Sequence, residues 1–206
     1  MATGRPSDPP LILASASPRR RQLLGEAGYS FIVAEPPVDE PEHIGPDVPP
    51  THKAEALSYF KARSVAGQFD TGLIIAADTL VVCGAEVFGK PTDLEDARRI
   101  LGALLGRRQE IITGVTLLDA GTERRMISHD VTVVVMGDPP VEQVEAYLAG
   151  GAWRGKAGAY GIQDEGDAFV ERVEGSFTNV VGLPMELLSS MLLDWGYGPA
   201  QSLKRL

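Results

Sequence analysis

A turn rich in serine leads into three consecutive arginines near the start of the chain, in the stretch "SASPRRRQLL" (15–24). Ser17 followed by Pro18 predicts a helix start, with the serine as N-cap and the proline at the first helical position. Cations are unfavourable there, because the free amide groups of a helix N-terminus already carry partial positive charge. Free amides and guanidinium groups together bind phosphate oxygens well, so the stretch indicates either an anion site or a solvated basic turn.

Helical spacing separates the three arginines from one another. Arg19 and Arg20 share a face with two leucines and are expected to face the body of the protein, whereas Arg21 is expected to point to water. Ser15 and Ser17 add hydroxyl donors at the same turn. The anion site predicted from these residues therefore consists of Ser15, Arg19 and Arg20.

A single aspartate interrupts the most apolar segment of the chain, "IIAADTLVV" (74–82). Both alternating faces of this segment are apolar, which predicts a strand that is buried on both sides. Burying an ionised carboxylate is unfavourable unless a cation, a metal or hydrogen-bond donors meet it. Asp78 is therefore expected either in a structural ion pair with an arginine, or as a metal ligand or general base that faces a bound phosphate.

Three further charged residues are candidates for the same chemistry. Lys90 lies in a "GKP" turn, where a glycine lets the backbone approach a ligand. Lys61 lies on a predicted helix among other charges, so its pattern favours a solvated lysine. Glu40 lies in an acidic, proline-rich loop and is a candidate for holding a divalent ion, although acids in loops are usually solvated. The histidines at positions 43, 52 and 129 show no ligand spacing and are assigned structural roles.

Composition limits the classes of partner. The chain of 206 residues has 19 Lys and Arg against 28 Asp and Glu, for a net charge of -9. Such an acidic chain is not expected to bind nucleic acid or a membrane surface. The stretch "MATGRPSDPP" has no apolar signal segment and no stretch is apolar enough to span a membrane, so a cytoplasmic location is expected. Cys83 is the only cysteine, which excludes an intrachain disulfide and a cysteine-based zinc site. A polyanionic ligand would need a local cluster of Arg and Lys and a divalent cation.

Strand and helix patterns alternate along the chain, which predicts an α/β fold. Strands are expected at 11–16, 29–34, 72–84, 109–119, 129–136 and 168–173. Helices are expected at 17–27, 51–66, 93–106, 141–151 and 185–195. Thr92 and Glu95 are expected to form a capping box for the third of these helices, and Asp138 to open the fourth. Turns or loops are expected at 35–50, 84–91, 155–166 and 173–184.

Four stretches in this order resemble the Maf family of nucleoside triphosphate pyrophosphatases: "LASASPRR", "AADTLVV" continuing to "GKP", "GKAGAYGIQ" and "EGSFTNVVGLP". The resemblance implies an elongated, curved mixed sheet flanked by helices, with two lobes and a nucleotide-binding cleft, similar to the inosine triphosphate pyrophosphatases. It also implies hydrolysis between the α and β phosphates with a divalent metal (Mg, Mn or Co), and a homodimer. We expect a loose leader at 1–10, one such domain at 11–195 and a tail at 196–206.

The same resemblance assigns roles to individual residues. Asp78 matches the catalytic aspartate, which activates water and binds metal. The polar substrate and metal cluster is matched by Ser15, Arg19, Arg20, Glu40, Lys61 and Lys90. Base selectivity is linked to the positions of Arg19, Thr79 and Gln163.

The ending "AYGIQ" of the third stretch resembles the subgroup that acts on dTTP and UTP. A glutamine amide offers both a donor and an acceptor, which suits the O4/N3–H edge of uracil or thymine. The expected activity is hydrolysis of dTTP, UTP and modified pyrimidine nucleotides to the monophosphate and pyrophosphate. Two alternatives stay open: a non-catalytic nucleotide-binding regulator of cell division, and a pyrophosphatase specific for 7-methyl-GTP or CTP.

Overall fold

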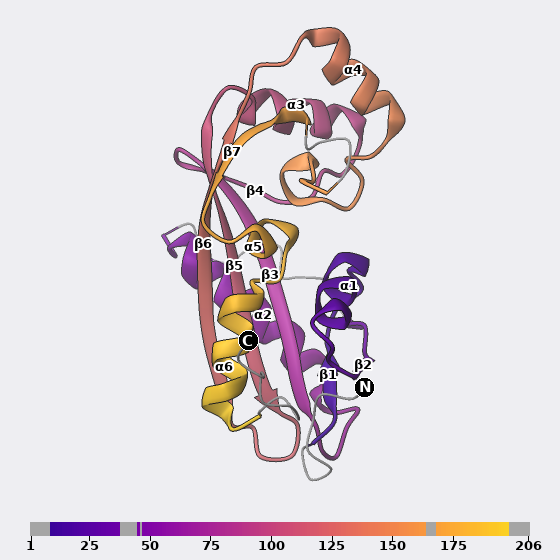
Figure 1. The fold of residues 1–206 in the computed structure, drawn as a ribbon, viewed down its shortest axis with the longest axis vertical. Coiled ribbons are helices and arrows are strands. Elements are labelled where there is room, and N and C mark those ends of the chain that lie inside the picture. Colours follow the sequence, from indigo (N-terminus) through magenta and orange to yellow (C-terminus); the bar gives the residue numbers. More distant parts are fainter. Residues whose placement is uncertain (1–8, 38–44, 46, 164–167, 198–206) are drawn as a thin grey trace, which may run out of the picture. The chain divides into compact units, whose positions relative to one another are not determined.

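The computed structural model describes residues 9–37, 45, 47–163 and 168–197 (Figure 1). The described strands form one mixed sheet in the order β2-β1-β3-β5-β6-β7, with the short β4 paired to β3. Its strands are β1 (Leu11–Leu13), β2 (Phe31–Val33), β3 (Leu73–Cys83), β4 (Glu86–Phe88), β5 (Arg108–Asp119), β6 (Arg125–Met136) and β7 (Val170–Glu174). The helices are α1 (Pro18–Glu26), α2 (Pro50–Ala66), α3 (Leu94–Leu104), α4 (Val141–Gly150), α5 (Phe177–Val181) and α6 (Met185–Trp195), with a 3-10 turn η1 (Ala157–Ala159). The α/β class expected from the sequence is confirmed.

The chain divides into two compact units. Unit 1 comprises residues 1–78, 114–129 and 185–206, and unit 2 comprises residues 79–113 and 130–184. The division falls within β3, β5 and β6, so each of these strands contributes residues to both units. Each unit also contains one tryptophan, Trp195 in unit 1 and Trp153 in unit 2.

Unit 1 is built on a parallel core. Strand β1 pairs in parallel with both β2 and β3, so that Leu13 lies opposite Val33 on one side and Ile75 on the other. Helix α2 contributes Ala62, Val65 and Ala66 to the buried cluster around these strands. In Figure 1, α2 lies behind the strands of this unit and α6 in front of them, so helices cover both faces.

One glycine allows α2 and β5 to approach each other closely. A Cβ atom placed on Gly114 would lie 2.2 Å from the backbone carbonyl oxygen of Ala54. Because that contact is with backbone, no rotation of a side chain can relieve it. Gly114 is therefore required where it stands.

Helix α1 begins and ends close to the residues that the sequence indicates. The side chain of Ser17 accepts a hydrogen bond from the amide of Arg20, and Pro18 is the first helical residue. The helix ends at Glu26, and Gly28 adopts a φ of 83°, which an L side chain rarely takes. These signals lie within a few residues of the helix ends, which explains why they are readable from sequence.

Unit 2 departs from the sequence-based expectations in its short elements. The segments 84–91 and 173–184, expected as turn and loop, contain β4 and α5. Their lengths of 3 and 5 residues are too short to show a clear hydrophobic period. The first part of β6, which belongs to unit 1, begins at Arg125 and therefore earlier than the expected residue 129.

Two predicted helix caps are also wrong. Helix α3 is capped by Asp93, whose side chain accepts from the amide of Asp96 at 2.8 Å. The return contact runs from the amide of Thr92 to the carboxylate of Asp96 at 3.1 Å, so Glu95 takes no part in it. Helix α4 starts after Pro140 with no side-chain cap, and Asp138 does not cap it.

None of the helices in the described part of the chain has the length and apolar character needed to cross a membrane.

Candidate active site

Strand β3 carries a carboxylate into the interior of unit 1. Asp78 is 4% exposed, and its Oδ1 atom accepts a hydrogen bond from the ammonium group of Lys61 on α2. Lys61 is itself only 9% exposed. The expectation of a solvated Lys61 is therefore wrong, as is an arginine partner for Asp78. A buried carboxylate needs a counter-charge, and in this fold a lysine from the covering helix supplies it.

The start of α1 gathers the predicted anion-binding groups within the same unit. The hydroxyl of Ser15, a buried residue, accepts from the backbone amide of Ser17 at 3.1 Å and from the guanidinium group of Arg20 at 3.5 Å. Arg19 and Arg20 are half-buried, as helical spacing predicts. Arg21 is exposed, with its Nη2 atom 4.0 Å from the carboxylate of Glu35. Two arginines and a hydroxyl therefore surround a helix N-terminus whose first turn holds no acidic residue.

In unit 2, the stretches that contain Lys90 and Gln163 are held together by backbone contacts. The amide of Gly158 donates to the carbonyl of Gly89, next to Lys90, at 3.0 Å. A Cβ atom on Gly158 would lie 3.0 Å from a methyl group of Val81 on β3, and the residue has a φ of 74°. The turn η1 therefore packs closely on β3 because it has glycine at this point. Lys90 and Gln163 are both exposed.

Two buried tyrosines anchor the segment that leads to Gln163. The hydroxyl of Tyr147 donates to the carbonyl of Ala159 at 3.0 Å, and the hydroxyl of Tyr160 accepts from the amide of Gln109 at 2.9 Å. Burial raises the pKa of Tyr160 far above its ordinary value, so this phenol stays neutral. Ala159 adopts a φ of 64°, which is unusual for a residue other than glycine. The anchored tyrosines hold this backbone in place.

Thr79, named from the sequence, belongs to a group of polar side chains in unit 2 whose other members the sequence did not single out. The hydroxyl of Thr79 lies 3.0 Å from that of Thr113, which in turn lies 3.3 Å from the carbonyl oxygen of Asn179. The side-chain amide of Asn179 donates to Thr132 and to the carbonyl of Ile111, each at 3.0 Å. Asn179 lies in "EGSFTNVVGLP", so the sequence marked the segment but not the contact.

Two residues considered from the sequence, Glu40 and His43, lie outside the residues that the structure describes. His129, assigned a structural role from the sequence, lies with its Nδ1 atom 2.7 Å from the carboxylate of Glu55 on α2. Cys83 is half-buried at the end of β3.

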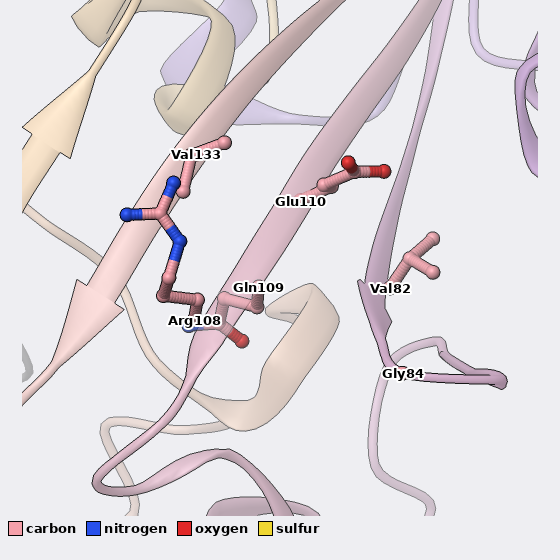
Figure 2. A pocket seen from close by; sticks show the side chains of 6 residues that line it. All are labelled: Val82, Gly84, Arg108, Gln109, Glu110 and Val133. Atoms are coloured by element: carbon pink, nitrogen blue, oxygen red, sulfur yellow. The ribbon is translucent and has the colours of Figure 1, made fainter.

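A cavity of about 310 Å³ lies elsewhere in unit 2 (Figure 2). The residues that line it are Val82, Gly84, Arg108, Gln109, Glu110 and Val133. Arg108 is engaged by the carboxylate of Glu174 at 3.0 Å. None of the residues predicted from the sequence to bind substrate or metal lines this cavity, so we do not assign it to the reaction.

Comparison with known proteins places these residues in a family. The model of the family described as "Maf-like protein" matches residues 10–195. A dTTP/UTP pyrophosphatase of Ruminiclostridium cellulolyticum is 43% identical over 183 residues, covering 88% of this chain and 94% of that protein. A dTTP/UTP pyrophosphatase of Pelotomaculum thermopropionicum is 40% identical over 187 residues, covering 91% and 97%. Among solved structures, a HAM1 protein from Coxiella burnetii is 19% identical with a TM-score of 0.43, covering 63% of this chain and 74% of that chain. The match of the family model over most of the chain, together with relatives at 40% identity or above, establishes that this chain belongs to the Maf family.

Proposed function

We propose that this chain hydrolyses dTTP and UTP to the nucleoside monophosphate and pyrophosphate. The observation that carries the proposal is the buried carboxylate of Asp78 in unit 1, held by Lys61 in the unit that also contains the arginine-bearing start of α1. The names of the relatives at 40% identity and above support the same activity and the same substrates.

In this proposal Asp78 acts as the general base. One of its carboxylate oxygens, Oδ1, is engaged by Lys61, which leaves Oδ2 to accept a proton from water. The activated water attacks the α phosphorus. The bond between that phosphorus and the oxygen bridging to the β phosphorus breaks, and pyrophosphate leaves with the electron pair of that bond. Lys61 positions the carboxylate, and a rigidly held base is one source of catalytic rate.

The triphosphate is assigned to the cationic groups. Arg19 and Arg20 supply guanidinium groups, Ser15 supplies a hydroxyl, and the first amides of α1 supply further donors. Lys90 is assigned to the same substrate on the strength of the family resemblance. The arginines and the positive end of the helix dipole repel each other, and a bound polyanion would neutralise both. The start of α1 is therefore more favourable with a phosphate ligand bound than without one.

Base selectivity is assigned to Thr79 and Gln163. The amide of Gln163 can donate to one group on a pyrimidine edge and accept from its neighbour. Gln163 is exposed, so its amide is accessible to a ligand. The anchored backbone of η1 limits the positions that this amide can reach, which is a requirement for telling one base from another.

A divalent cation fits the donor set that these residues offer. Mg²⁺ is commonly held by one or two carboxylates together with substrate phosphates, and Asp78 supplies one such carboxylate. Across the described ranges, no group of three or more His, Cys, Asp or Glu side chains lies together as an all-protein cage. We propose that Asp78 and Glu40 hold the metal together with the triphosphate. When bound, it would neutralise phosphate charge during the reaction.

The test is pyrophosphate release from dTTP, UTP, CTP and 7-methyl-GTP with Mg²⁺, Mn²⁺ or Co²⁺. Wild type is expected to act on dTTP and UTP, and Asp78→Asn is expected to lose that activity. Because the change removes the carboxylate that the buried Lys61 contacts, the double variant Asp78→Asn/Lys61→Met is measured beside it. The exposed Asp70, changed to Asn, is the matched control and should keep full activity.

Other results would support the alternatives. Binding of nucleotide by wild type without pyrophosphate release from any of them would replace the enzyme with a nucleotide-binding regulator. Release from 7-methyl-GTP or CTP in preference to dTTP and UTP would keep the reaction and overturn the proposed base. Full activity in a folded Asp78→Asn variant would remove Asp78 from the role of base.

A further inference from the structure

Helix α2 lies against β5 at two points within unit 1. Gly114 on β5 lets the backbone of Ala54 approach, because a Cβ atom at this glycine would lie 2.2 Å from the Ala54 carbonyl oxygen. Two residues further along the strand, the hydroxyl oxygen of Thr116 lies 2.7 Å from that of Ser58. Four residues of a helix rise about 6 Å and two residues of a strand about 6.6 Å, so the spacing of the two contacts matches. Together they fix the position of α2 along β5.

The hydrogen bond between the two hydroxyls has a defined direction. Ser58 and Thr116 are both completely buried. The hydroxyl of Ser58 donates to the carbonyl of Glu55 on its own helix at 2.8 Å. A hydroxyl group has a single hydrogen, so the hydrogen shared by the two side chains belongs to Thr116. Thr116 therefore donates from β5 to α2 at a point that is buried from solvent.

One turn beyond Ser58, the same face of α2 carries Lys61. Its ammonium group donates to Oδ1 of Asp78 on β3, the strand next to β5 in the sheet. A shift of α2 along β5 would move this ammonium group relative to the carboxylate. We propose that Thr116 is a positioning residue, whose hydrogen bond to Ser58 holds α2 where Lys61 meets Asp78. This inference rests on the proposed function, because that function makes Asp78 the general base.

The variant Thr116→Val removes the hydroxyl with little change in shape. Without that hydrogen bond, α2 is free to shift on β5, and the ammonium group of Lys61 is held less closely at Asp78. We expect kcat for dTTP to fall about fivefold, the effect of one neutral hydrogen bond. KM should stay near the wild-type value, because the triphosphate is assigned to groups at the start of α1. The conservative variant Thr116→Ser keeps the hydroxyl and should keep the wild-type kcat.

Coupling to the ion pair separates positioning from a general loss of stability. In the Asp78→Asn/Lys61→Met background no ion pair is left to align, so Thr116→Val should shift the urea midpoint of unfolding less than it does in wild type. Leu188→Val is the matched control, because Leu188 is completely buried on α6 in unit 1 and a shorter side chain there costs stability without removing the hydrogen bond. This control should keep the wild-type kcat and shift the midpoint equally in both backgrounds.

The proposal is overturned by a wild-type kcat in folded Thr116→Val, by an equal fall of kcat in Leu188→Val, or by a fall in Thr116→Ser. Equal midpoint shifts of Thr116→Val in the two backgrounds also overturn it. If Thr116→Val does not fold, Ser58→Ala replaces it in both measurements, since loss of the accepting hydroxyl must have the same effects. Absence of pyrophosphate release in wild type overturns the proposed function alone, and the urea midpoints in the two backgrounds then decide the inference.

Discussion

Removal of either partner of the buried Asp78–Lys61 pair should be strongly destabilising. The two side chains are only 6% and 11% exposed, so each charge is compensated by the other more than by water. Removing one partner of a buried ion pair costs about 3–5 kcal/mol, a large share of a typical unfolding free energy of about 5–15 kcal/mol. We therefore expect Asp78→Asn and Lys61→Met each to lower the free energy of unfolding by about 3–5 kcal/mol. The double variant, which leaves no buried charge, should lose less than either single variant.

Urea unfolding at neutral pH, followed by circular dichroism, measures all three variants as a double-mutant cycle. The exposed pair of Arg63 and Glu123 gives the control, because Arg63 lies on the same helix α2 and its guanidinium lies 2.6 Å from the Glu123 carboxylate. With side chains 43% and 65% exposed, that pair should contribute no more than about 1 kcal/mol. Single variants that each cost less than about 1 kcal/mol, or costs that simply add in the double variant, would refute the reasoning.

Three further outcomes are expected. Arg20→Ala should lower kcat/KM for dTTP by about 10- to 150-fold, because charge-assisted hydrogen bonds to the substrate are lost. Arg21 is exposed, so Arg21→Ala should stay near the wild-type kcat/KM. Equal effects of the two changes in a pyrophosphate-release assay would contradict the assignment of Arg20 to the triphosphate. Gly114→Ala should lower the free energy of unfolding by about 2–3 kcal/mol in urea titrations, since its Cβ would meet the backbone of α2. Hydrogen bonds from Arg108 and Arg172 hold the pKa of Glu174 below its ordinary value. Ionised Glu174 therefore stabilises the fold at pH values above the pKa of this group in the unfolded chain. That stabilisation is lost as the pH falls through the lower pKa of the folded state. Glu174→Gln should therefore reduce the difference in urea midpoint between pH 7 and acidic pH, and an unchanged difference would count against this.

Elements with local signals were the ones that sequence reasoning could find. The start and end of α1 depend on Ser17, Pro18 and Gly28, all of which act on their immediate neighbours. Helix α6 was predicted with its observed bounds because an amphipathic pattern continues over its whole length. Strand β4 has only three residues, which pair with the adjacent β3. Helix α5 has five residues and is held by contacts of Asn179 with β5 and β6, so both elements leave little trace in their own sequence.

The contacts of the candidate site also depend on residues that are distant in the sequence, and local patterns do not predict them. The burial of β3 indicated that Asp78 needs a partner, but the identity of that partner depends on how α2 packs on the strand. Lys61 has the sequence surroundings of a solvated residue and is nevertheless buried. Thr113 has the sequence surroundings of an ordinary β-strand residue, since threonine is common in strands. Its contact with Thr79 follows from strand register, which no local pattern specifies.

Each unit contains one tryptophan, which can serve as a fluorescence probe for that unit. In unit 2, the indole of Trp153 is buried and donates to the carbonyl of Leu148 at 3.0 Å. In unit 1, the guanidinium of Arg124 lies 4.2 Å from the ring centre of Trp195. Since the chain contains no other tryptophan, replacing one of them by phenylalanine leaves a fluorescence signal from a single unit. Unfolding of each unit can then be followed separately, and coincident transitions would identify the strands shared by both units as the basis of cooperative unfolding.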